Sequence, residues 1–304
     1  MSVIEVEHLS KTYGSTVAVD DISFSVQEGE IFGILGPNGA GKTTTVECME
    51  GLRTRDSGSV RILGLDPRTD RAELTQILGA QLQESALPDR LRVSEAMELY
   101  SSFYRDPADW RDLVKSLGLD GKTGTAFKKL SGGQKQRLSI ALALVGNPKV
   151  AVLDELTTGL DPEARRHTWD LISGVRDRGV TIILVTHFME EAERLCDRVA
   201  LVDSGRIVAL DTPAALAESI QAGMTIRFLA PATFDTALLS ALPDVTSVIR
   251  RGDTVTVTGN SNSLAAVTTT LAHLEIAPRQ LRVDQANLED AFLALVGRHD
   301  ESEN

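Results

Sequence analysis

The sequence lacks the marks of several large classes of protein. It has only two cysteines, Cys48 and Cys196, and neither lies in a C-x-x-C or Cys/His pattern. We therefore expect core thiols in a reducing compartment, and neither a disulfide nor a zinc site. The N-terminal segment has no basic start followed by an apolar stretch, so we expect no signal peptide. No apolar run approaches the roughly 18 residues of a membrane span, so any spanning part would come from another chain.

An excess of basic residues is missing as well. The net charge is -12. Binding to nucleic acid depends on Lys and Arg residues that neutralise phosphates, so this charge predicts no nucleic-acid partner. The hydrophobic residues (42%) and charged residues (24%) are ordinary for a globular protein. The 304 residues are enough for one full-sized α/β domain and a smaller one.

Short apolar segments alternate with helical patterns over the first two thirds of the chain. Alternating residues at 3–6 and 22–26 predict half-buried antiparallel strands. Continuous apolar strands are predicted at 31–35, 150–153, 181–185 and 199–202. The region 73–146 is predicted to be mostly helical, with helix starts at Ser94, Pro107 and Ser131. Further helices are predicted at 162–177 and 190–195. Strands that alternate with helices indicate an α/β fold with a mainly parallel sheet.

The pattern changes after about residue 214. Strands are predicted at 225–229, and at 245–250 and 254–258, which form a hairpin. Helices are predicted at 263–274 and 287–295. The chain therefore divides into a domain at 1–215 and a C-terminal α+β domain at 220–304, of about 85 residues.

The strongest chemical signal is a glycine-rich segment between a predicted strand and a predicted helix. It matches the phosphate-binding pattern G-x-x-x-x-G-K-[ST]. Glycines allow main-chain N–H groups to curl around phosphate oxygens, and the helix N-terminus adds partial positive charge. We expect Lys42 to reach the β- and γ-phosphates and the Thr43 hydroxyl to bind Mg²⁺. The alternative is a plain turn before a helix. The segment consists of Gly36, Pro37, Asn38, Gly39, Ala40, Gly41, Lys42, Thr43 and Thr44.

Two carboxylates, Asp154 and Glu155, follow the predicted apolar strand at 150–153. Buried charges are costly unless they are compensated, so the pair needs a partner. Beside a phosphate-binding loop, we expect Asp154 to hold Mg²⁺, directly or through water. Glu155 would orient or deprotonate the water that attacks the γ-phosphate. The alternative is a pair of acids that cap the next helix or face solvent.

A second glycine motif, Leu-Ser-Gly-Gly-Gln at 130–134, stands before an amphipathic helix. Ser131 is a natural N-cap, so this is a second helix N-terminus suited to an anion. One phosphate cradle is enough for most P-loop enzymes, and the second one calls for an explanation.

Taken together, five motifs resemble the ATP-binding subunits of ABC transporters: GPNGAGKTT, LSGGQKQR, VAVLDE, TTGLDP and TH at 186–187. The resemblance covers about residues 1–215. It implies an ATPase with ATP and Mg²⁺, and a P-loop core with an N-terminal antiparallel β subdomain and a helical subdomain at about 84–146. It also implies head-to-tail pairing, in which the second motif of one chain closes over the nucleotide of a second copy. The residues implied in that contact are Ser131, Gly132, Gly133 and Gln134.

The resemblance extends to single residues. Tyr13 matches the aromatic residue that stacks on adenine; the alternative is a plain surface aromatic. Gln83 matches the glutamine that senses Mg²⁺ and links to the helical subdomain, although Gln81 lies only two residues earlier. His187 matches the histidine that contacts the γ-phosphate and supports Glu155.

Two further positions lie near the acidic pair. Asp161 matches the acid that communicates across the dimer, and it can also cap the helix that starts at Pro162. Leu156 stands where the family commonly has proline, which would fix the backbone and remove a donor. We expect leucine at this position to preserve hydrolysis and to leave the backbone of the loop somewhat less restrained.

The C-terminal helix gives a finer resemblance. Residues 287–295 and 186–193 are similar to ATP-binding subunits of drug-resistance exporters of the daunorubicin-resistance type. This resemblance implies export of a small molecule (drug, antibiotic or lipid-like) through a separate ABC-2 type permease, with the chain peripheral at the cytoplasmic face of the membrane. Leu288, Phe292 and Leu295 could equally form a stripe into a small core. The open alternatives are an importer ATPase with a C-terminal regulatory domain and a non-transport ABC ATPase.

Overall fold

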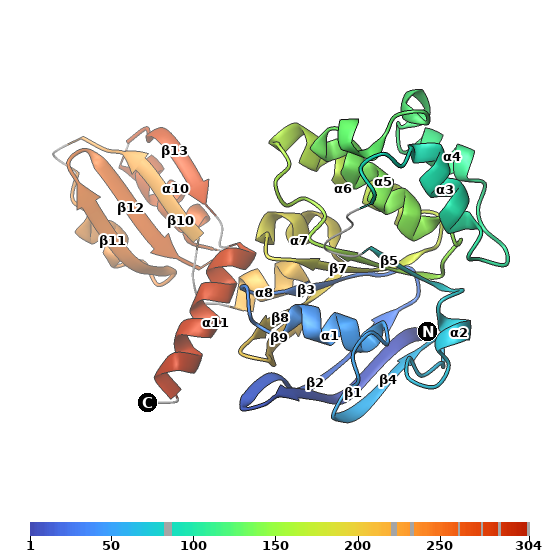
Figure 1. The fold of residues 1–304 in the computed structure, drawn as a ribbon. Helices are drawn as coiled ribbons and strands as arrows, with labels where there is room; N and C mark the ends of the chain where they lie inside the picture. Colours follow the sequence, from blue (N-terminus) through green and yellow to red (C-terminus); the bar gives the residue numbers. More distant parts are fainter. Residues whose placement is uncertain are drawn as a thin grey trace. The chain divides into compact units, whose positions relative to one another are not determined.

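The computed structural model describes residues 1–81, 87–219, 224–231, 234–260, 262–274, 276–284 and 287–302. The chain divides into two units, Met1–Thr212 and Pro213–Asn304 (Figure 1). Each has its own core, and each is described by itself below.

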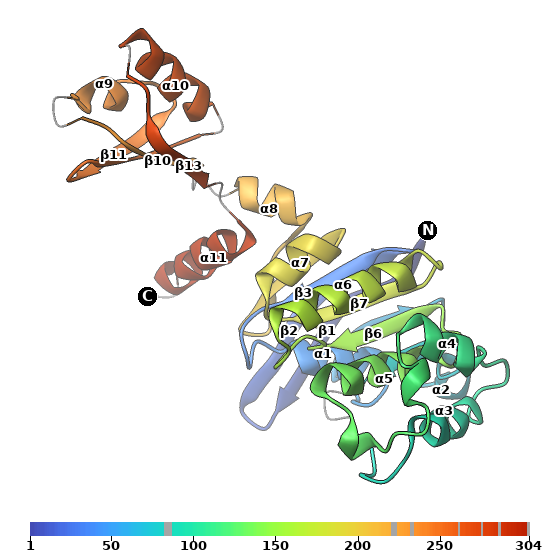
Figure 2. The same cartoon turned by 90° about the horizontal axis from the view of Figure 1, so that it is seen from above.

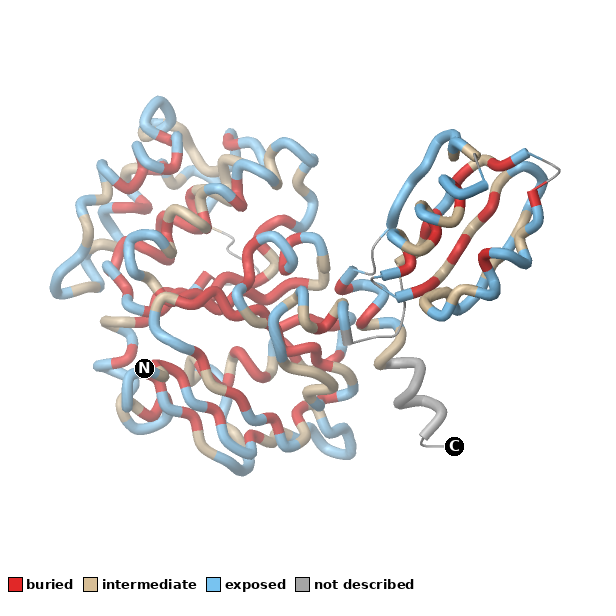
Figure 3. Tube along the Cα trace, turned by 180° about the vertical axis from the view of Figure 1, so that it is seen from behind, coloured by how far each residue is buried: buried red, intermediate tan, exposed pale blue. Residues whose placement is uncertain are grey.

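A six-stranded sheet forms the centre of the first unit. Neighbouring strands are parallel except for the last pair, which is antiparallel. Both faces of a parallel sheet are covered, so its strands are continuous apolar runs. Figure 3 shows these strands as a band of buried residues. The predicted strands at 31–35, 150–153, 181–185 and 199–202 are confirmed. The strand order is β5 (Leu78–Gln81), β6 (Val150–Asp154), β7 (Thr181–Thr186), β3 (Ile31–Leu35), β8 (Arg198–Asp203) and β9 (Arg206–Asp211).

A three-stranded antiparallel sheet covers one face of the six-stranded sheet. Its order is β2 (Thr16–Gln27), β1 (Ser2–Tyr13) and β4 (Ser57–Ile62). The inward residues of all three strands join the core cluster that contains Val152 and Val185. Helix α1 (Lys42–Met49) lies between the two sheets (Figure 1). The predicted antiparallel strands at 3–6 and 22–26 are therefore parts of longer strands, and β4 was not predicted.

Helices cover the other face of the six-stranded sheet. Helix α5 (Gly132–Leu144) packs on β5 and β6, and α7 (Met189–Leu195) packs on β3 and β7 (Figure 2). Helix α6 (Pro162–Arg176) packs against α7. Helices α3 (Val93–Ser101) and α4 (Trp110–Ser116) pack against α5, and the short α2 (Arg71–Leu74) precedes β5.

In the region 73–146, the predicted helix start at Pro107 is wrong, and one strand was not predicted. The region contains strand β5. Its four residues, Leu-Gly-Ala-Gln, show neither an apolar run nor a clear alternation, so the sequence carries no strand signal there. Helix α4 does not start near Pro107, because Asp109 caps it: the Asp109 carboxylate accepts a hydrogen bond from the Arg111 N–H at 2.8 Å. Helix α3 begins at Val93, one residue before the predicted Ser94. Ser131 is confirmed as the N-cap of α5.

The second unit contains a four-stranded antiparallel sheet with a β-α-β-β-α-β order. The elements are β10 (Met224–Leu229), α9 (Ala237–Ser240), β11 (Val245–Arg251), β12 (Thr254–Gly259), α10 (Ser263–His273) and β13 (Arg279–Asp284). Along β12, Val255 and Val257 are buried between threonines, which is the alternation of a sheet with one covered face. The predicted hairpin is confirmed.

Helices α8 (Pro213–Ser219) and α11 (Leu288–Ser302) contact each other in the second unit. Leu288 and Ala291 of α11 are fully buried, whereas Phe292 and Leu295 are half-buried. Within the parts of the chain that the structure describes, no helix has both the length and the hydropathy that a membrane crossing requires.

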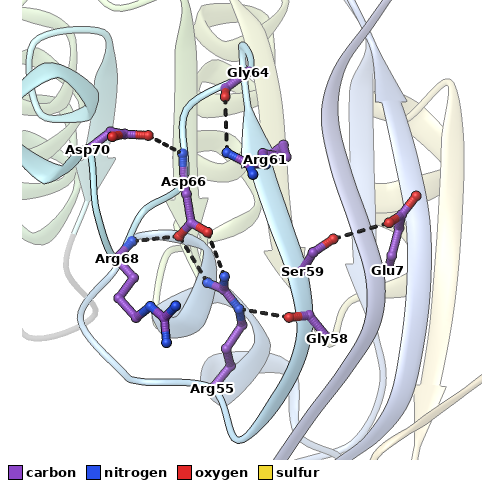
Figure 4. A network of polar contacts seen from close by, with 9 residues as sticks. All are labelled: Glu7, Arg55, Gly58, Ser59, Arg61, Gly64, Asp66, Arg68 and Asp70. Carbon is purple, nitrogen blue, oxygen red and sulfur yellow. Dashed lines mark hydrogen bonds and ion pairs between the residues drawn. The ribbon is translucent and has the colours of Figure 1, made fainter.

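An ion pair, Arg55 with Asp66, joins the segment after α1 to the turn after β4 (Figure 4). Two guanidinium nitrogens of Arg55 donate to the two carboxylate oxygens of Asp66, at 3.2 and 2.7 Å. The third donates to the Gly58 carbonyl at 3.0 Å. Asp66 also accepts from the Arg68 N–H, and its own N–H donates to the Asp70 carboxylate. Both partners of the pair are about nine-tenths buried, so removal of one would leave a buried charge unpaired.

We predict that Arg55→Met lowers the free energy of unfolding by about 3 kcal/mol at pH 7. The Arg55 guanidinium holds the pKa of Asp66 below its usual value. The pair therefore stabilises the fold above the ordinary pKa of an aspartate, and this contribution is lost as falling pH protonates Asp66. The deficit of the variant, measured by urea unfolding, should persist down to about pH 4 and narrow only as the pH falls below the ordinary aspartate pKa of 3.8.

Two comparisons make this test specific. Arg55→Met/Asp66→Asn should recover part of the loss, because no unpaired charge remains. Arg53→Met removes a more exposed pair with Glu47 and should cost less than about 1 kcal/mol. Equal losses for Arg53→Met and Arg55→Met would contradict the importance of the buried pair.

Candidate nucleotide site

The glycine-rich loop joins the end of β3 to the start of α1 and lies tightly against its neighbours. A Cβ atom at Gly36 would stand 2.0 Å from the Val202 carbonyl oxygen. Gly41 has a φ of 99°, and a Cβ there would stand 2.2 Å from the Ala18 carbonyl oxygen. Both positions therefore require glycine for the fold of this chain itself. Pro37, Asn38 and Gly39 form the exposed crest of the loop, whereas Ala40 is buried.

Lys42 places a buried cation under this loop. Its side chain is 5% exposed, and its Nζ donates to the carbonyl oxygens of Gly36 and Pro37, both at 2.9 Å. Burial lowers the pKa of Lys42, while the nearby charges of Glu155 and Asp154 raise it. The first N–H groups of α1, where Thr43 and Thr44 lie, have no acceptors within the helix. Thr43 is exposed and Thr44 half-buried.

Asp154 ends β6 and is itself almost buried, at 6% exposed. Its Oδ1 has no hydrogen-bond partner among the described residues. Burial, and next the charge of Glu155, raise the pKa of Asp154 to about 6, while Lys42 opposes the shift. A buried carboxylate oxygen without a partner calls for an explanation, and a cation would supply one.

The donor set here fits Mg²⁺, which proteins commonly bind through one or two carboxylates together with substrate phosphates. Asp154 offers the orphaned oxygen, and Thr43 offers an exposed hydroxyl at the loop. In the described parts of the chain, no cluster of three or more His, Cys, Asp or Glu could hold a metal by itself. An ion at this position would therefore need additional oxygen ligands from a bound nucleotide.

Glu155 adopts a backbone conformation that is rare for a residue with a side chain. Its φ is 47°, and its N–H donates to the Val185 carbonyl at 2.9 Å. The Glu155 Oε1 lies 3.2 Å from Nδ1 of His187, the residue after β7. Left-handed backbone at such a residue costs of order 1 kcal/mol and is typical of functional sites. Leu156 is fully buried. Packing of its side chain therefore restrains the loop after β6, as the ring of a proline would do at this position.

The second glycine motif has a different local structure from the first. The Ser131 hydroxyl accepts from the Gln134 N–H at 3.3 Å, and the Gln134 side chain accepts from the Ser131 N–H at 3.0 Å. Neither Gly132 nor Gly133 has a positive φ, and a Cβ at either would meet only ordinary contacts, at 4.0 and 3.7 Å. The described chain therefore does not itself require glycine at these two positions.

A hollow of about 300 Å³ opens beside this motif. It joins the motif to the loop before α6, where Asp161 accepts from the N–H groups of Glu163 and Ala164 at 3.1 and 2.9 Å. The predicted N-cap role of Asp161 is confirmed. The lining of the hollow includes no residue of the loop at 36–44, so the two glycine motifs do not share this hollow. The lining residues are Ser131, Gly132, Gly133, Gln134, Arg137, Gly159, Leu160, Asp161 and Ala164.

Tyr13 ends β1 and is 41% exposed. Two cations lie near its ring: Lys11 Nζ is 5.5 Å and Arg53 Cζ is 5.8 Å from the ring centre. An exposed aromatic ring can accept a base on its face.

Of the two candidate glutamines, Gln81 lies in strand β5. Gln83 lies in the segment 82–86, outside the described residues. Gln81 is the last residue of β5 and pairs with Leu153, next to Asp154. It is 7% exposed, and its Oε1 has no partner within the described chain.

Glu50, which follows α1, is a residue of the site that was not predicted from the sequence. Burial, and next the charges of Asp154 and Glu47, raise the pKa of Glu50 to about 8. Glu50 thus adds a further acid near Asp154. Its position four residues after the buried Val46 places it on the covered face of the helix. This spacing was the available signal.

Comparisons with known proteins now give the family. A sequence model described as "ABC transporter" matches residues 19–158. The "Nod factor export ATP-binding protein I" of Paraburkholderia xenovorans (strain LB400) is 37% identical over 306 residues, which cover 98% of each chain. The chain belongs to the ABC transporter family. The protein of the same name from Burkholderia orbicola (strain AU 1054) is 39% identical, over 97% of each chain. As an ATP-binding member of this family, the chain binds ATP and is an ATPase.

Solved structures of ABC transporter proteins share the fold. A structure described as the ATP-binding subunit of an ABC transporter is 26% identical, with a TM-score of 0.64 over 70% of this chain and 91% of that chain. A structure described as a dimeric bacterial ABC transporter cassette is also 26% identical, with a TM-score of 0.62 over 69% of this chain and 98% of that chain. The predicted α/β fold class is confirmed.

We predict that Glu50→Gln stabilises this ABC ATPase at high pH. The pKa of Glu50 in the folded chain, about 8, lies above its value in the unfolded chain. Ionisation of this acid therefore costs stability as the pH rises from about 4.5 to 8. The variant should match the wild type near pH 5 and exceed its free energy of unfolding by about 2 kcal/mol at pH 9.

Urea unfolding of both proteins from pH 5 to 9 measures this difference. Glu73→Gln, which changes an exposed acid on α2, serves as the control and should show no such gain. A constant difference across the pH range for Glu50→Gln would contradict the raised pKa.

Proposed function

We propose that this chain is the ATP-hydrolysing subunit of an exporter and powers the outward transport of a small molecule through a separate ABC-2 type membrane permease. The main support for export is that relatives 37% and 39% identical, over nearly the whole chain including its C-terminal unit, are named as export ATP-binding proteins. A drug, an antibiotic or a lipid-like molecule is the proposed class of substrate. In this proposal, residues 1–215 are the ATP-binding domain and 220–304 an accessory domain.

Each part of the site has a proposed role in binding. The loop from Gly36 to Thr44 cradles the phosphates with its N–H groups, and Lys42 leaves its two carbonyl acceptors to meet the β- and γ-phosphates. Thr43, Asp154 and Gln83 hold Mg²⁺, which would offset the negative charge of the phosphates. Tyr13 stacks on the adenine.

Glu155 and His187 carry the proposed hydrolysis. The observation that supports it is the 3.2 Å contact between Glu155 Oε1 and His187 Nδ1, beside the buried Asp154. Glu155 orients the attacking water and accepts its proton. His187 keeps the carboxylate in place and contacts the γ-phosphate.

A second copy of the chain completes the proposed site. Ser131, Gly132, Gly133 and Gln134, with Asp161 nearby, close over the nucleotide of the partner in a head-to-tail dimer. Two observations support this. The hollow beside this motif contains no residue of the phosphate loop. Moreover, nothing in the described chain requires Gly132 or Gly133, so close approach by another molecule explains them best. The dimer sits at the cytoplasmic face of the membrane and binds no nucleic acid.

We predict that Glu155→Gln keeps ATP binding and loses nearly all hydrolysis, because glutamine cannot accept the proton. With its permease in inverted membrane vesicles, the variant should also stop transport of the substrate into the vesicle lumen. Phosphate release and ATP binding, measured on the same preparation, check the first part.

The matched control is Glu163→Gln, an exposed acid in the first turn of α6, which should hydrolyse and transport at the wild-type rate. Normal turnover by Glu155→Gln would contradict the role of Glu155. ATP-dependent transport of substrate out of the lumen would contradict export.

A further inference from the structure

Helices α6 and α7 make two side-chain contacts one helical turn apart. The Arg165 guanidinium carbon lies 4.5 Å from the ring centre of Phe188. One turn further along α6, Trp169 Nε1 donates to Glu191 Oε1 at 3.0 Å. Residues four apart share one face of a helix, so both contacts belong to a single α6–α7 seam.

Only the Arg165 contact leads to the proposed hydrolytic pair. The Phe188 and His187 rings lie 4.1 Å apart between centres, tilted by 39°. Phe188 is held by its N–H, which donates to the Thr186 hydroxyl at 3.0 Å. His187 in turn meets Glu155. Arg165, Phe188, His187 and Glu155 therefore form one continuous stack of contacts.

In the part of the chain that the structure describes, no acidic partner explains the position of the Arg165 charge. Within the described residues Arg165 forms no ion pair, and its Nε is buried without a hydrogen-bond partner. Its neighbour Arg166 is exposed. A guanidinium held over an aromatic face in this way contributes a planar contact that lysine would reproduce only in part.

We propose that Arg165 and Phe188 are positioning residues for ATP hydrolysis. The stack holds the His187 ring in the orientation in which Nδ1 faces Glu155. Arg165 also lies one turn into α6, where its N–H donates to the Asp161 carbonyl at 2.9 Å, so the stack joins the hydrolytic pair to the helix that borders the hollow beside the second glycine motif. The inference rests on the proposed roles of Glu155 and His187.

Steady-state ATP hydrolysis by four variants tests the stack. Phe188→Leu and Arg165→Met should each lower kcat about tenfold, with KM for ATP changed less than about twofold, because the phosphate-binding loop is untouched. Phe188→Tyr keeps the ring and should retain nearly the wild-type kcat. The double variant Arg165→Met/Phe188→Leu should lose no more than the worse single variant, because both residues act through one stack.

Two controls separate positioning from packing. Arg166→Met, next to Arg165 but exposed, should keep the wild-type kcat. Trp169→Phe breaks the other contact of the seam; it should lower the melting temperature and leave kcat unchanged. The same melting measurement shows that the Arg165 and Phe188 variants are folded.

The inference is overturned if folded Arg165→Met and Phe188→Leu keep the wild-type kcat, or if their effects on kcat multiply in the double variant. Loss of activity in Phe188→Tyr equal to that in Phe188→Leu would overturn it as well. Glu155→Gln separates a failure of the stack from a failure of the proposed function. If that variant hydrolyses ATP normally, the proposed function fails; if it is inactive while Arg165→Met is unaffected, only the stack fails.

Discussion

The attraction between Lys42 and the acids at the end of β6 is the interaction on which the site depends. The fold buries Lys42 and Asp154 together, and burial disfavours the charged form of each. Each partly compensates the other, but one lysine faces Asp154 and Glu155, with Glu50 close to Asp154. The balance remains acidic, and one Asp154 oxygen has no partner in the described chain. A divalent cation at this position would offset the acidic charge and give the Asp154 oxygen a partner.

The glycines of the two motifs differ in what they do for the fold of this chain. Gly36 and Gly41 are required by the chain's own packing, because a side chain at either would clash with a neighbouring carbonyl. Gly132 and Gly133 meet no such obstacle. The N-terminus of α5, where they lie, is open to the hollow beside it, and these glycines are not required by the packing of the chain. Such an end is suited to an anionic ligand that a second molecule holds. The stack from Arg165 to Glu155 begins on α6, the helix that Asp161 caps beside this hollow.

Much of the first unit could be predicted from the sequence, because its signals are local. The apolar run at 31–35 ends where β3 ends, and Ser131 caps α5 through a pattern that spans four residues. Strand β5 was hidden because Leu78–Gln81 includes glycine and glutamine, and only its pairing with β6 reveals it. Pro107 was a poor guide to α4, because the Asp109 side chain supplies the cap. The proposed roles of Arg165 and Phe188 depend on contacts between distant segments, which no local pattern reports. The spacing of Glu50 places it on the covered face of α1, but the charge of Asp154 beside it comes from a distant strand.

We propose that one chain cannot complete a hydrolytic site by itself. Mixing two inactive variants distinguishes sites shared between chains from sites within one chain. Lys42→Ala spoils the phosphate loop, and Ser131→Arg spoils the second glycine motif. In a head-to-tail heterodimer, both defects fall in one site and the other site is intact. With random pairing, the mixture should recover up to about a quarter of the wild-type ATPase activity. If heterodimers form and the mixture stays as inactive as each variant alone, the sites are not shared between chains.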